Sequence, residues 1–154
     1  KYIAERVEYR DGHLYWRLKI LRRKSTPLGL ENSEGYRRIQ VRGGRGVQAH
    51  RVIFYMHYGY LPICVDHIDG NPRNNRIENL RAASIAQNTW NAKTPVTNTS
   101  GRKGVSWSKA ARKWGASIRV NRKQISLGLY EKFEDAVSAR QQAEEKYHGE
   151  FAKQ

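Results

Sequence analysis

The limited supply of apolar residues sets the size of any core that this chain can build. Hydrophobic residues make up 38% of its 154 positions, and charged residues make up 28%. One or two small domains fit this composition, and a second large catalytic domain is excluded. No apolar run approaches the roughly 20 residues that span a bilayer, and no signal-peptide pattern opens the sequence. We therefore expect a cytoplasmic protein without a membrane segment.

The charge balance points to an acidic partner. The chain has 29 Lys and Arg residues against 14 Asp and Glu residues, which gives a formal net charge of +15. Nucleic acid is the first candidate because each phosphate that Lys or Arg neutralises releases condensed counterions. Ribosomal proteins, membrane-surface proteins and proteins with a solvated basic surface share this charge. The motifs must decide between these classes.

A single cysteine, Cys64, narrows the kinds of site that the chain can carry. It cannot form an intramolecular disulfide, and a cysteine-rich zinc cluster cannot be built around it. We therefore expect a reducing, intracellular setting and no zinc. Because the sequence begins with Lys1 rather than Met, we also expect that further residues precede it in the complete protein.

The first part of the chain is β-rich. Asp11-Gly12 separates runs at 3–9 and 14–19, and an Asp-Gly pair between alternating runs is a strong hairpin signal. The alternating run 35–41 and the short run 47–49, joined by a glycine-rich turn, predict a second hairpin. We therefore expect two β-hairpins before residue 50.

Two helices and a linker follow. Apolar residues recur at helical spacing over 50–58, and Gly59 closes that segment. Ser84 and Gln87 match a capping box, so a second helix is expected to begin at Ser84. The segment 93–101 has no periodicity and many turn formers, which predicts a linker between a domain at 1–92 and a domain at 102–154.

Between the two predicted helices, residues 65–81 form a polar segment that is rich in Asn and bounded by short apolar runs. It is too polar for a core and too patterned for a linker. The segment contains Asp66-His67, with Asn79 twelve residues after the histidine, and Asn88 follows nine residues later. A lone histidine in an Asn-rich loop is usually structural, so the histidine by itself does not indicate a catalytic site.

This spacing resembles the His-Asn-His (HNH) nuclease motif in the variant whose last residue is Asn. The segments Asp-His-Ile-Asp-Gly-Asn and Asn-Asn-Arg-Ile-Glu-Asn-Leu-Arg also resemble sequences of that family. Residues 1–92 resemble phage and intron-encoded HNH homing endonucleases. The resemblance implies a ββα-metal fold that holds one divalent cation. It also implies that Asn79 ties together the loop that orients His67.

The chemistry of phosphodiester hydrolysis explains these residue types. A base must activate water, and a neutral imidazole can take that proton at physiological pH, so His67 is the candidate base. A carboxylate and an amide oxygen suit Mg²⁺ or Mn²⁺, so Asp66 and Asn88 are the candidate ligands. Neighbours on a strand point to opposite faces, so Asp66 and His67 are expected to flank a bound phosphate. The remaining candidates are assigned structural roles: His13, His50, His57, His148 and Asp69.

The last third of the chain predicts three strands and a helix, with strands at 104–108, 113–120 and 124–130. Apolar residues from Phe133 to Tyr147 recur at helical spacing. The middle strand alternates between an apolar side and a polar, basic side, so the helix is expected to cover the apolar side. By this alternation Trp107 and Trp114 are expected to pack under the helix rather than stack on bases.

The words at 100–107, 113–119, 127–130 and 133–136 resemble the plant Apetala/ethylene-response-factor DNA-binding domain. That family lays its three-stranded sheet into the major groove, which admits β-structure. This chain has mostly Ser where the plant domains have Arg and Trp, and Arg119 is the best candidate for a guanine contact. Basic residues in the turns between the strands, such as Arg122 and Lys123, are suited to contact DNA phosphates. The predicted DNA-binding residues are Lys103, Ser106, Ser108, Lys113, Ser117, Arg119, Arg122, Lys123 and Gln124.

The sequence thus predicts an α+β protein that acts as a site-directed DNA endonuclease on double-stranded DNA. One active site per chain favours nicking, and we expect a monomer from a phage or mobile element in a bacterial host. Two alternatives stay open: a transcription regulator in which the HNH site is a silent scaffold, and a structure-selective nuclease acting on branched DNA. Nicking of plasmid DNA with Mg²⁺ or Mn²⁺ distinguishes an endonuclease from the transcription regulator. Comparing cleavage of linear and branched duplexes tests for the structure-selective nuclease.

Overall fold

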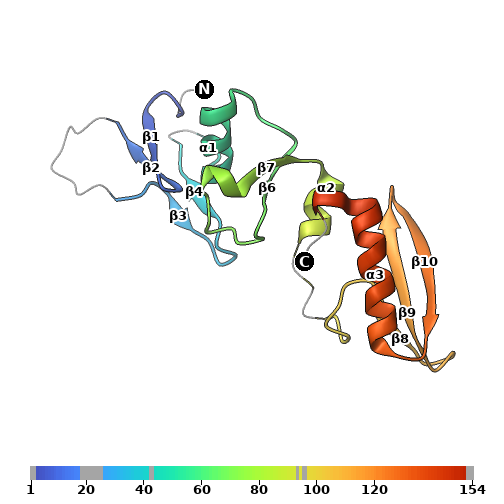
Figure 1. Ribbon diagram of the computed structural model, residues 1–154. Helices are drawn as coiled ribbons and strands as arrows, with labels where there is room; N and C mark the ends of the chain where they lie inside the picture. Colours follow the sequence, from blue (N-terminus) through green and yellow to red (C-terminus); the bar gives the residue numbers. More distant parts are fainter. Residues whose placement is uncertain (1–2, 18–25, 42–43, 93, 95–96, 152–154) are drawn as a thin grey trace. The chain divides into compact units, whose positions relative to one another are not determined.

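The computed structural model of the chain describes residues 3–17, 26–41, 44–92, 94 and 97–151. It divides into two compact units, residues 1–88 and 89–154, and Figure 1 colours them from blue to red along the sequence. Small antiparallel sheets and helices make up both units, which is compatible with the expected α+β class. The division falls shortly before the predicted linker at 93–101, of which residues 93, 95 and 96 lie outside the described part.

The first hairpin of the N-terminal unit forms where the sequence predicts it. Strand β1 (Val7–Arg10) pairs antiparallel with β2 (His13–Trp16). Asp11 and Gly12 between them both have positive φ, 46° and 80°. A two-residue hairpin turn requires positive φ at both residues so that its twist matches that of the strands. Residues 18 and 19 of the predicted second strand lie outside the described ranges.

The second hairpin is also present, as part of a three-stranded sheet in the order β3-β4-β5. Strand β4 (Arg37–Ile39) pairs antiparallel with β5 (Val47–Gln48), which confirms the predicted hairpin. Strand β3 (Leu30–Glu31) adds to its edge and was not predicted. Two exposed residues are too short for the apolar alternation that identifies a strand.

Helix α1 (Ala49–Tyr58) follows β5 directly and ends where predicted. Gly59 adopts a left-handed φ of 75°, and its N–H donates to the carbonyl of Tyr55 at 2.9 Å, which closes the last turn. The helix packs on the core of the unit through its buried face. That core consists of Val7, Leu14, Ile39, Ala49, Ile53, Phe54, Val65 and Leu80.

Two antiparallel strands and a helix complete the N-terminal unit. Strand β6 (Cys64–His67) pairs with β7 (Leu80–Ala83), and the loop between them ends in the 3-10 turn η1 (Ile77–Asn79). Helix α2 (Ile85–Asn91) follows at once and reaches into the second unit. This β6-β7-α2 order has the succession of elements that the HNH resemblance implies.

The C-terminal unit is a three-stranded sheet with one helix along it (Figure 1). Its strands β8 (Val105–Ser108), β9 (Lys113–Val120) and β10 (Lys123–Tyr130) are antiparallel in the order β10-β9-β8. Helix α3 (Phe133–His148) and the short turn η2 (Gly149–Phe151) follow. All four predicted elements of this part are therefore present.

Helix α3 covers the predicted face of the sheet. Buried Val105, Ala116 and Ala136 form the centre of this core, and Trp114 contacts Phe133 with ring centroids 4.9 Å apart. Trp107 differs from the prediction: it is 47% exposed and contacts only the edge of the core, through the Trp114 ring at 5.3 Å. It lies on strand β8 at the margin of the sheet, where α3 does not cover it fully.

The end of α3 also differs from the predicted pattern. Tyr147 is 36% exposed, whereas His148 is buried and stacks on Trp90 with ring centroids 4.1 Å apart and planes at 11°. The ammonium group of Lys103 donates to the carbonyl oxygens of Trp90 and Ala92. The C-terminal unit therefore begins in the second half of α2, because Trp90 packs on α3.

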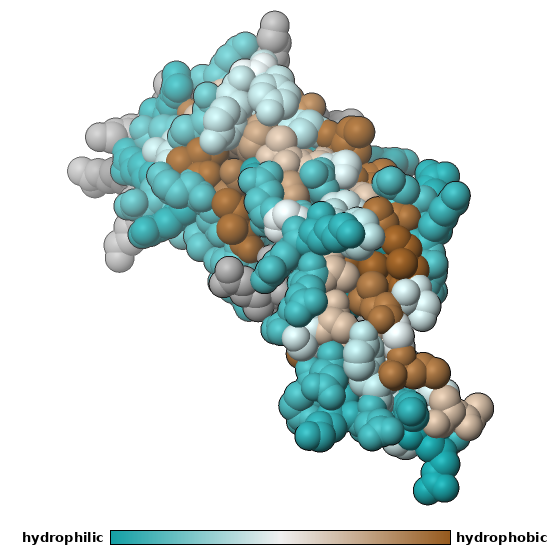
Figure 2. Space-filling model, turned by 45° about the vertical axis from the view of Figure 1, so that its right-hand side comes forward, coloured by the Kyte–Doolittle hydropathy of each residue, from teal (hydrophilic) through white to brown (hydrophobic). Residues whose placement is uncertain are grey.

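Hydrophilic residues cover most of the face shown in Figure 2, and apolar residues interrupt them in separate patches. Within the described ranges, no helix combines the length and the apolar character that crossing a membrane requires.

Candidate functional site

The predicted site lies on the β6-β7 hairpin. The register places Asp66 opposite Arg81 and His67 opposite Leu80, and the two predicted residues are both buried, at 4% and 5% exposure. Asp66 Oδ2 accepts a hydrogen bond from Arg81 Nε at 2.9 Å. Arg81 was not identified from the sequence, and its position directly across the strand from Asp66 explains the pairing.

His67 is held by an amide that sequence reasoning missed. Its Nε2 lies 2.9 Å from Oδ1 of Asn75, a residue that is only 2% exposed. An amide oxygen can only accept, so this hydrogen bond assigns the proton to Nε2 and the lone pair to Nδ1. The tautomer that Asn75 selects is therefore one that can accept a proton at Nδ1.

Two more rings pack against the His67 imidazole. The His50 ring from α1 lies 4.9 Å from it, centroid to centroid, and the Tyr36 ring lies 6.0 Å from it. His50 and Tyr36 also contact each other, with centroids 5.7 Å apart. His50, which we assigned a structural role from the sequence alone, therefore belongs to the surroundings of the predicted base.

His50 is 4% exposed, and its Nδ1 is buried without a hydrogen-bond partner in the described part of the chain. The pKa of His50 is lowered from 6.5 to about 3, chiefly by burial, with smaller contributions from the nearby His67 and Arg51. The His50 ring is therefore neutral at physiological pH. A neutral ring can pack against His67 without opposing a proton on it.

Asn79 closes the loop that follows His67. Its Nδ2 donates to Asp69 Oδ1 at 2.9 Å and to the carbonyl of Asn74 at 2.8 Å, and its Oδ1 accepts from the Asp69 N–H at 3.0 Å. Its backbone carbonyl accepts from the N–H of Ile68 at 2.9 Å. These four bonds connect the two ends of the loop, next to the strand that carries His67.

Asp69 is ionised within this loop. Burial raises the pKa of its carboxyl group, but hydrogen bonds from the Asn71 N–H and from the Asn74 and Asn79 amides outweigh that effect, and the nearby His67 acts in the same direction. The net result is a pKa below the ordinary value. Asp69 serves as an acceptor at the centre of the turn, which agrees with the turn role assigned from the sequence.

Asn88 lies in the first turns of α2. The predicted capping box is confirmed: the Ser84 N–H donates to Gln87 Oε1 at 2.8 Å, and the Gln87 N–H donates to Ser84 Oγ at 3.3 Å. The Asn88 N–H donates to the Ser84 carbonyl at 3.0 Å, and its side chain is exposed. The cap fixes the start of the helix that carries this predicted ligand.

The donor chemistry of Asp66 and Asn88 fits a divalent cation that keeps most of its waters. One carboxylate and one amide oxygen are hard ligands, and Mg²⁺ typically takes one or two such groups and completes its shell with water and phosphate oxygens. Among the described residues, no group of three or more His, Cys, Asp and Glu side chains could hold a metal. Asp66 and Asn88 are chemically suited to a divalent cation that takes its other ligands from water and phosphate.

The predicted DNA-binding residues of the C-terminal unit mostly share one face of the sheet. The register pairs Ser108 with Lys113, Arg119 with Gln124 and Ser117 with Ser126, and directly paired residues point to the same side. This side is opposite to Ala116 and Ile118, which are buried on the α3 side. The predicted residues on the open face are Ser106, Ser108, Lys113, Ser117, Arg119 and Gln124.

Three predicted contacts lie elsewhere. Arg122 and Lys123 are exposed at the β9-β10 turn, where Arg122 has a positive φ of 65°. Lys103 lies before β8, and its ammonium group is engaged by the Trp90 and Ala92 carbonyls rather than standing on the sheet face. The open face also includes Leu129, 55% exposed, which sequence alternation did not place there.

The comparisons with known proteins agree with the geometry of the hairpin. Residues 47–89 match a family model described as HNH endonuclease, a range that runs from β5 through β7 to the middle of α2. Protein 3.8 of Escherichia phage T7 is 42% identical over 89 residues, which cover 58% of this chain and 73% of that protein. No solved structure matches the chain. Residues 47–89 therefore form an HNH endonuclease domain, in a chain that is related to Protein 3.8 of phage T7.

Proposed function

We propose that this protein is a metal-dependent endonuclease that hydrolyses a phosphodiester bond of duplex DNA and leaves 5′-phosphate and 3′-hydroxyl ends. The observation that carries the proposal is the buried hydrogen bond from His67 to Asn75. Asp66 is the neighbour of His67 on the same strand, β6. This arrangement supplies a histidine base of defined tautomer next to a carboxylate. The HNH domain implies DNA as the substrate.

His67 acts as the general base. Nδ1 takes a proton from the attacking water, the water oxygen bonds to phosphorus, and the bond from phosphorus to the 3′ oxygen breaks. The 3′ oxygen then takes a proton from solvent. Asn75 keeps the Nε2 proton in place during this step, while the His50 and Tyr36 rings limit rotation of the imidazole.

Asp66 and Asn88 would hold the divalent cation, Mg²⁺ or Mn²⁺. When bound, such a cation neutralises negative charge on the phosphate and on the leaving 3′ oxygen. The Arg81 guanidinium donates to Asp66 Oδ2, so this buried carboxylate has a charged hydrogen-bond partner. Asn79 holds the loop between His67 and β7, so it acts as a positioning residue.

The C-terminal unit supports the duplex. Its open sheet face carries short polar side chains with Arg119 among them, and Arg122 and Lys123 project from the adjoining turn, where they can reach phosphates. This arrangement is compatible with the Apetala/ethylene-response-factor resemblance of the sequence. One HNH domain per chain favours a nick in one strand by a monomer.

The test is cleavage of supercoiled plasmid with Mg²⁺ or Mn²⁺. We expect conversion to nicked circles, loss of cleavage in His67→Ala with duplex binding retained, and full cleavage in the control His57→Ala. His57 is exposed at the end of α1. It is not one of the three mutually contacting rings of Tyr36, His50 and His67, which we call the His67 cluster. Unchanged cleavage in His67→Ala would remove His67 as the base. Tight duplex binding without nicking at any salt concentration would favour a DNA-binding regulator instead.

A further inference from the structure

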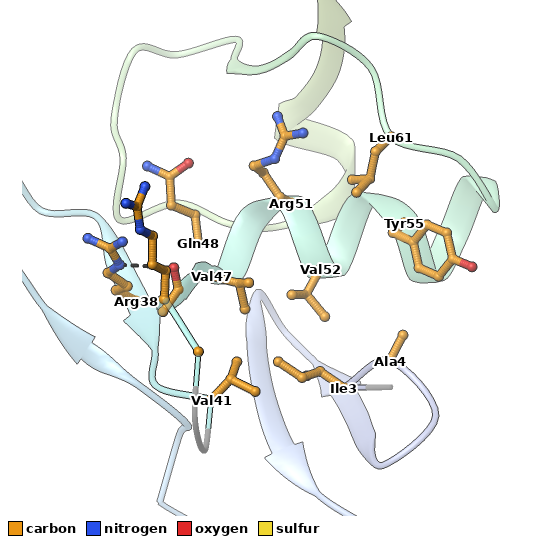
Figure 3. A pocket seen from close by; sticks show the side chains of 13 residues that line it. Ile3, Ala4, Arg38, Val41, Val47, Gln48, Arg51, Val52, Tyr55 and Leu61 are labelled. Carbon is orange, nitrogen blue, oxygen red and sulfur yellow. Dashed lines mark hydrogen bonds between the residues drawn. The ribbon is translucent and has the colours of Figure 1, made fainter. Parts of the chain in front are cut away.

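A second face of α1 lines a pocket of about 660 Å³ in the N-terminal unit (Figure 3). Arg51 and Val52 lie on this face, and Tyr55 follows one helical turn later, whereas His50 points from the same helix toward the His67 ring. The pocket and the predicted general base therefore lie against different faces of the same helix. The volume is in the ordinary range of small-ligand sites.

The pocket is positive at one end and apolar at the other. Figure 3 shows Arg38 and Gln48 at one side and Tyr55 and Leu61 at the other, with Val52 between them. Three arginines line the pocket, at positions 38, 45 and 51, and none of the described lining residues carries a carboxylate. An anion with an apolar part complements such a surface.

The arginines differ in what they can offer a ligand. Arg51 donates to the carbonyls of Ile63 and Pro62, so its guanidinium is fixed by the protein. Within the described part of the chain, the Arg38 guanidinium donates one hydrogen bond, from Nε to the Gly46 carbonyl at 3.1 Å, which leaves its two terminal nitrogens for a ligand. Arg45 is exposed in the turn before β5. Arg38 and Arg45 are therefore the groups that can contact a phosphate.

We propose that this pocket binds an unpaired nucleotide of the DNA substrate, with its base on the apolar side chains and its phosphate at Arg38 and Arg45. The inference rests on the proposed function, which supplies DNA as the partner. A base inside a uniform duplex is covered on both faces by its neighbours, whereas an unpaired base can stack on apolar and aromatic side chains. The Gln48 amide offers both a donor and an acceptor to the edge of such a base.

The substrate class follows from this geometry. An enzyme with a site for an unpaired nucleotide on the other face of the helix that packs against its general base, His67, binds flapped, bulged or branched DNA more tightly than uniform duplex. This favours the structure-selective alternative that the sequence left open. The energy of stacking one base predicts a preference of about tenfold or more.

The experiment measures binding by fluorescence anisotropy in EDTA, with the full chain carrying His67→Ala so that no DNA is cut. Two DNAs share one sequence: a uniform duplex and a duplex with a short unpaired flap. We expect about tenfold tighter binding of the flapped DNA, and loss of that preference in Arg38→Glu/Arg45→Glu and in Leu61→Glu. Leu61 is half exposed, so its substitution spares the core. The matched charge control Arg10→Glu should weaken both DNAs equally, because Arg10 lies on the exposed first hairpin.

A second measurement identifies the occupant directly. Titration of deoxyadenosine monophosphate should shift the methyl NMR signals of Val47, Val52 and Leu61. Equal affinity for the two DNAs, or a flap preference that survives both pocket variants, would overturn the proposal. So would an acidic, leucine-containing peptide that shifts these methyls when the nucleotide does not. Because the binding assay uses no metal and no cleavage, failure of plasmid nicking with flap preference intact would count against the proposed function alone.

Discussion

At the scale of single residues, we propose that the orientation of His67 depends on Asn75, a side chain that takes no part in the proposed proton transfer. Asn75 Oδ1 accepts a hydrogen bond from His67 Nε2, and these two buried atoms lie 2.9 Å apart. Asn75→Ala removes that acceptor, so the imidazole can change tautomer and rotate. We expect the single-turnover cleavage rate at saturating DNA to fall about 10- to 100-fold, the size of a typical general-base contribution lost in part, with DNA affinity unchanged. Cleavage at the wild-type rate in this variant would show that the hydrogen bond does not position the base.

His50 gives a prediction about pH and stability. Its pKa is lowered to about 3, chiefly by burial, from an ordinary value of 6.5. Between these two values the unfolded chain binds a proton that the folded chain does not, so the free energy of unfolding must fall as the pH decreases from 6.5 toward 3. One such group contributes about 1.4 kcal/mol per pH unit.

The measurement is urea unfolding of the wild type and of His50→Gln at several pH values between 7 and 4. We expect the variant to be less stable at pH 7, where it leaves the His67 cluster poorly packed, but to lose less stability on acidification. Parallel pH dependence in the two proteins would mean that His50 is charged in the folded state.

At the scale of elements, Gly104 shows how closely the segment before β8 approaches β9. Its φ is 73°, and a Cβ there would lie 2.3 Å from the Ser117 carbonyl oxygen and 2.9 Å from Arg140 Nε. The Gly104 carbonyl also accepts the Ser117 N–H at 2.8 Å. Arg140 Nη1 donates to the same Ser117 carbonyl at 2.8 Å, so a methyl group at Gly104 would disturb the anchor between α3 and the sheet.

We expect Gly104→Ala to destabilise the C-terminal unit by more than about 2 kcal/mol, since it combines a positive φ with a backbone clash. Gly101→Ala is the matched control, because Gly101 has the same φ of 73° but nothing within 4 Å of an added Cβ. The control should cost only the conformational strain, about 1 kcal/mol. Thermal unfolding of both variants, followed by far-UV circular dichroism, measures the difference; equal destabilisation would mean that the contact with Ser117 does not matter.

The sequence predicts most of these elements because their signals are local. The Asp11-Gly12 turn, the Ser84–Gln87 capping box and the three C-terminal strands each follow from a few neighbouring residues. What local patterns miss depends on long-range packing. The irregularity between Ser126 and Gly128 shifts the alternation of β10 and brings Leu129 to the open face.

The candidate site likewise combines residues that local sequence patterns suggest with residues that only the fold brings together. Asp66, His67, Asn79 and Asn88 could be proposed from the sequence, because they lie in one short stretch of the chain. Tyr36, just before β4, and His50, in α1, are distant in sequence from the motif, and only the fold brings their rings against His67. His50 had one weak signal, its position beside Arg51 ahead of the motif. Asn75 had only its place in an Asn-rich loop, which ordinary turns share.

At the scale of the whole molecule, the net charge of +15 belongs to both units rather than to one basic tail. Arginines line the N-terminal pocket, and Arg119, Arg122 and Lys123 lie on or beside the open face of the C-terminal sheet. If these groups together neutralise roughly 6–10 phosphates, DNA affinity should fall by ~10³–10⁵ between 50 and 200 mM salt. A charge spread of this kind predicts that each unit contributes separately to the salt dependence.

The salt dependence can be divided by substitution. Arg122→Ala/Lys123→Ala removes two candidate phosphate contacts at the β9-β10 turn, so the slope of log affinity against log salt concentration should fall in magnitude by about 2. Arg119→Ala, on the sheet face, should instead reduce discrimination between DNA sequences, by about 1–3 kcal/mol at one base pair. Anisotropy titrations at four salt concentrations measure both effects. An unchanged slope in the double variant would mean that the turn does not face the phosphates, and that the C-terminal sheet does not hold the duplex by this edge.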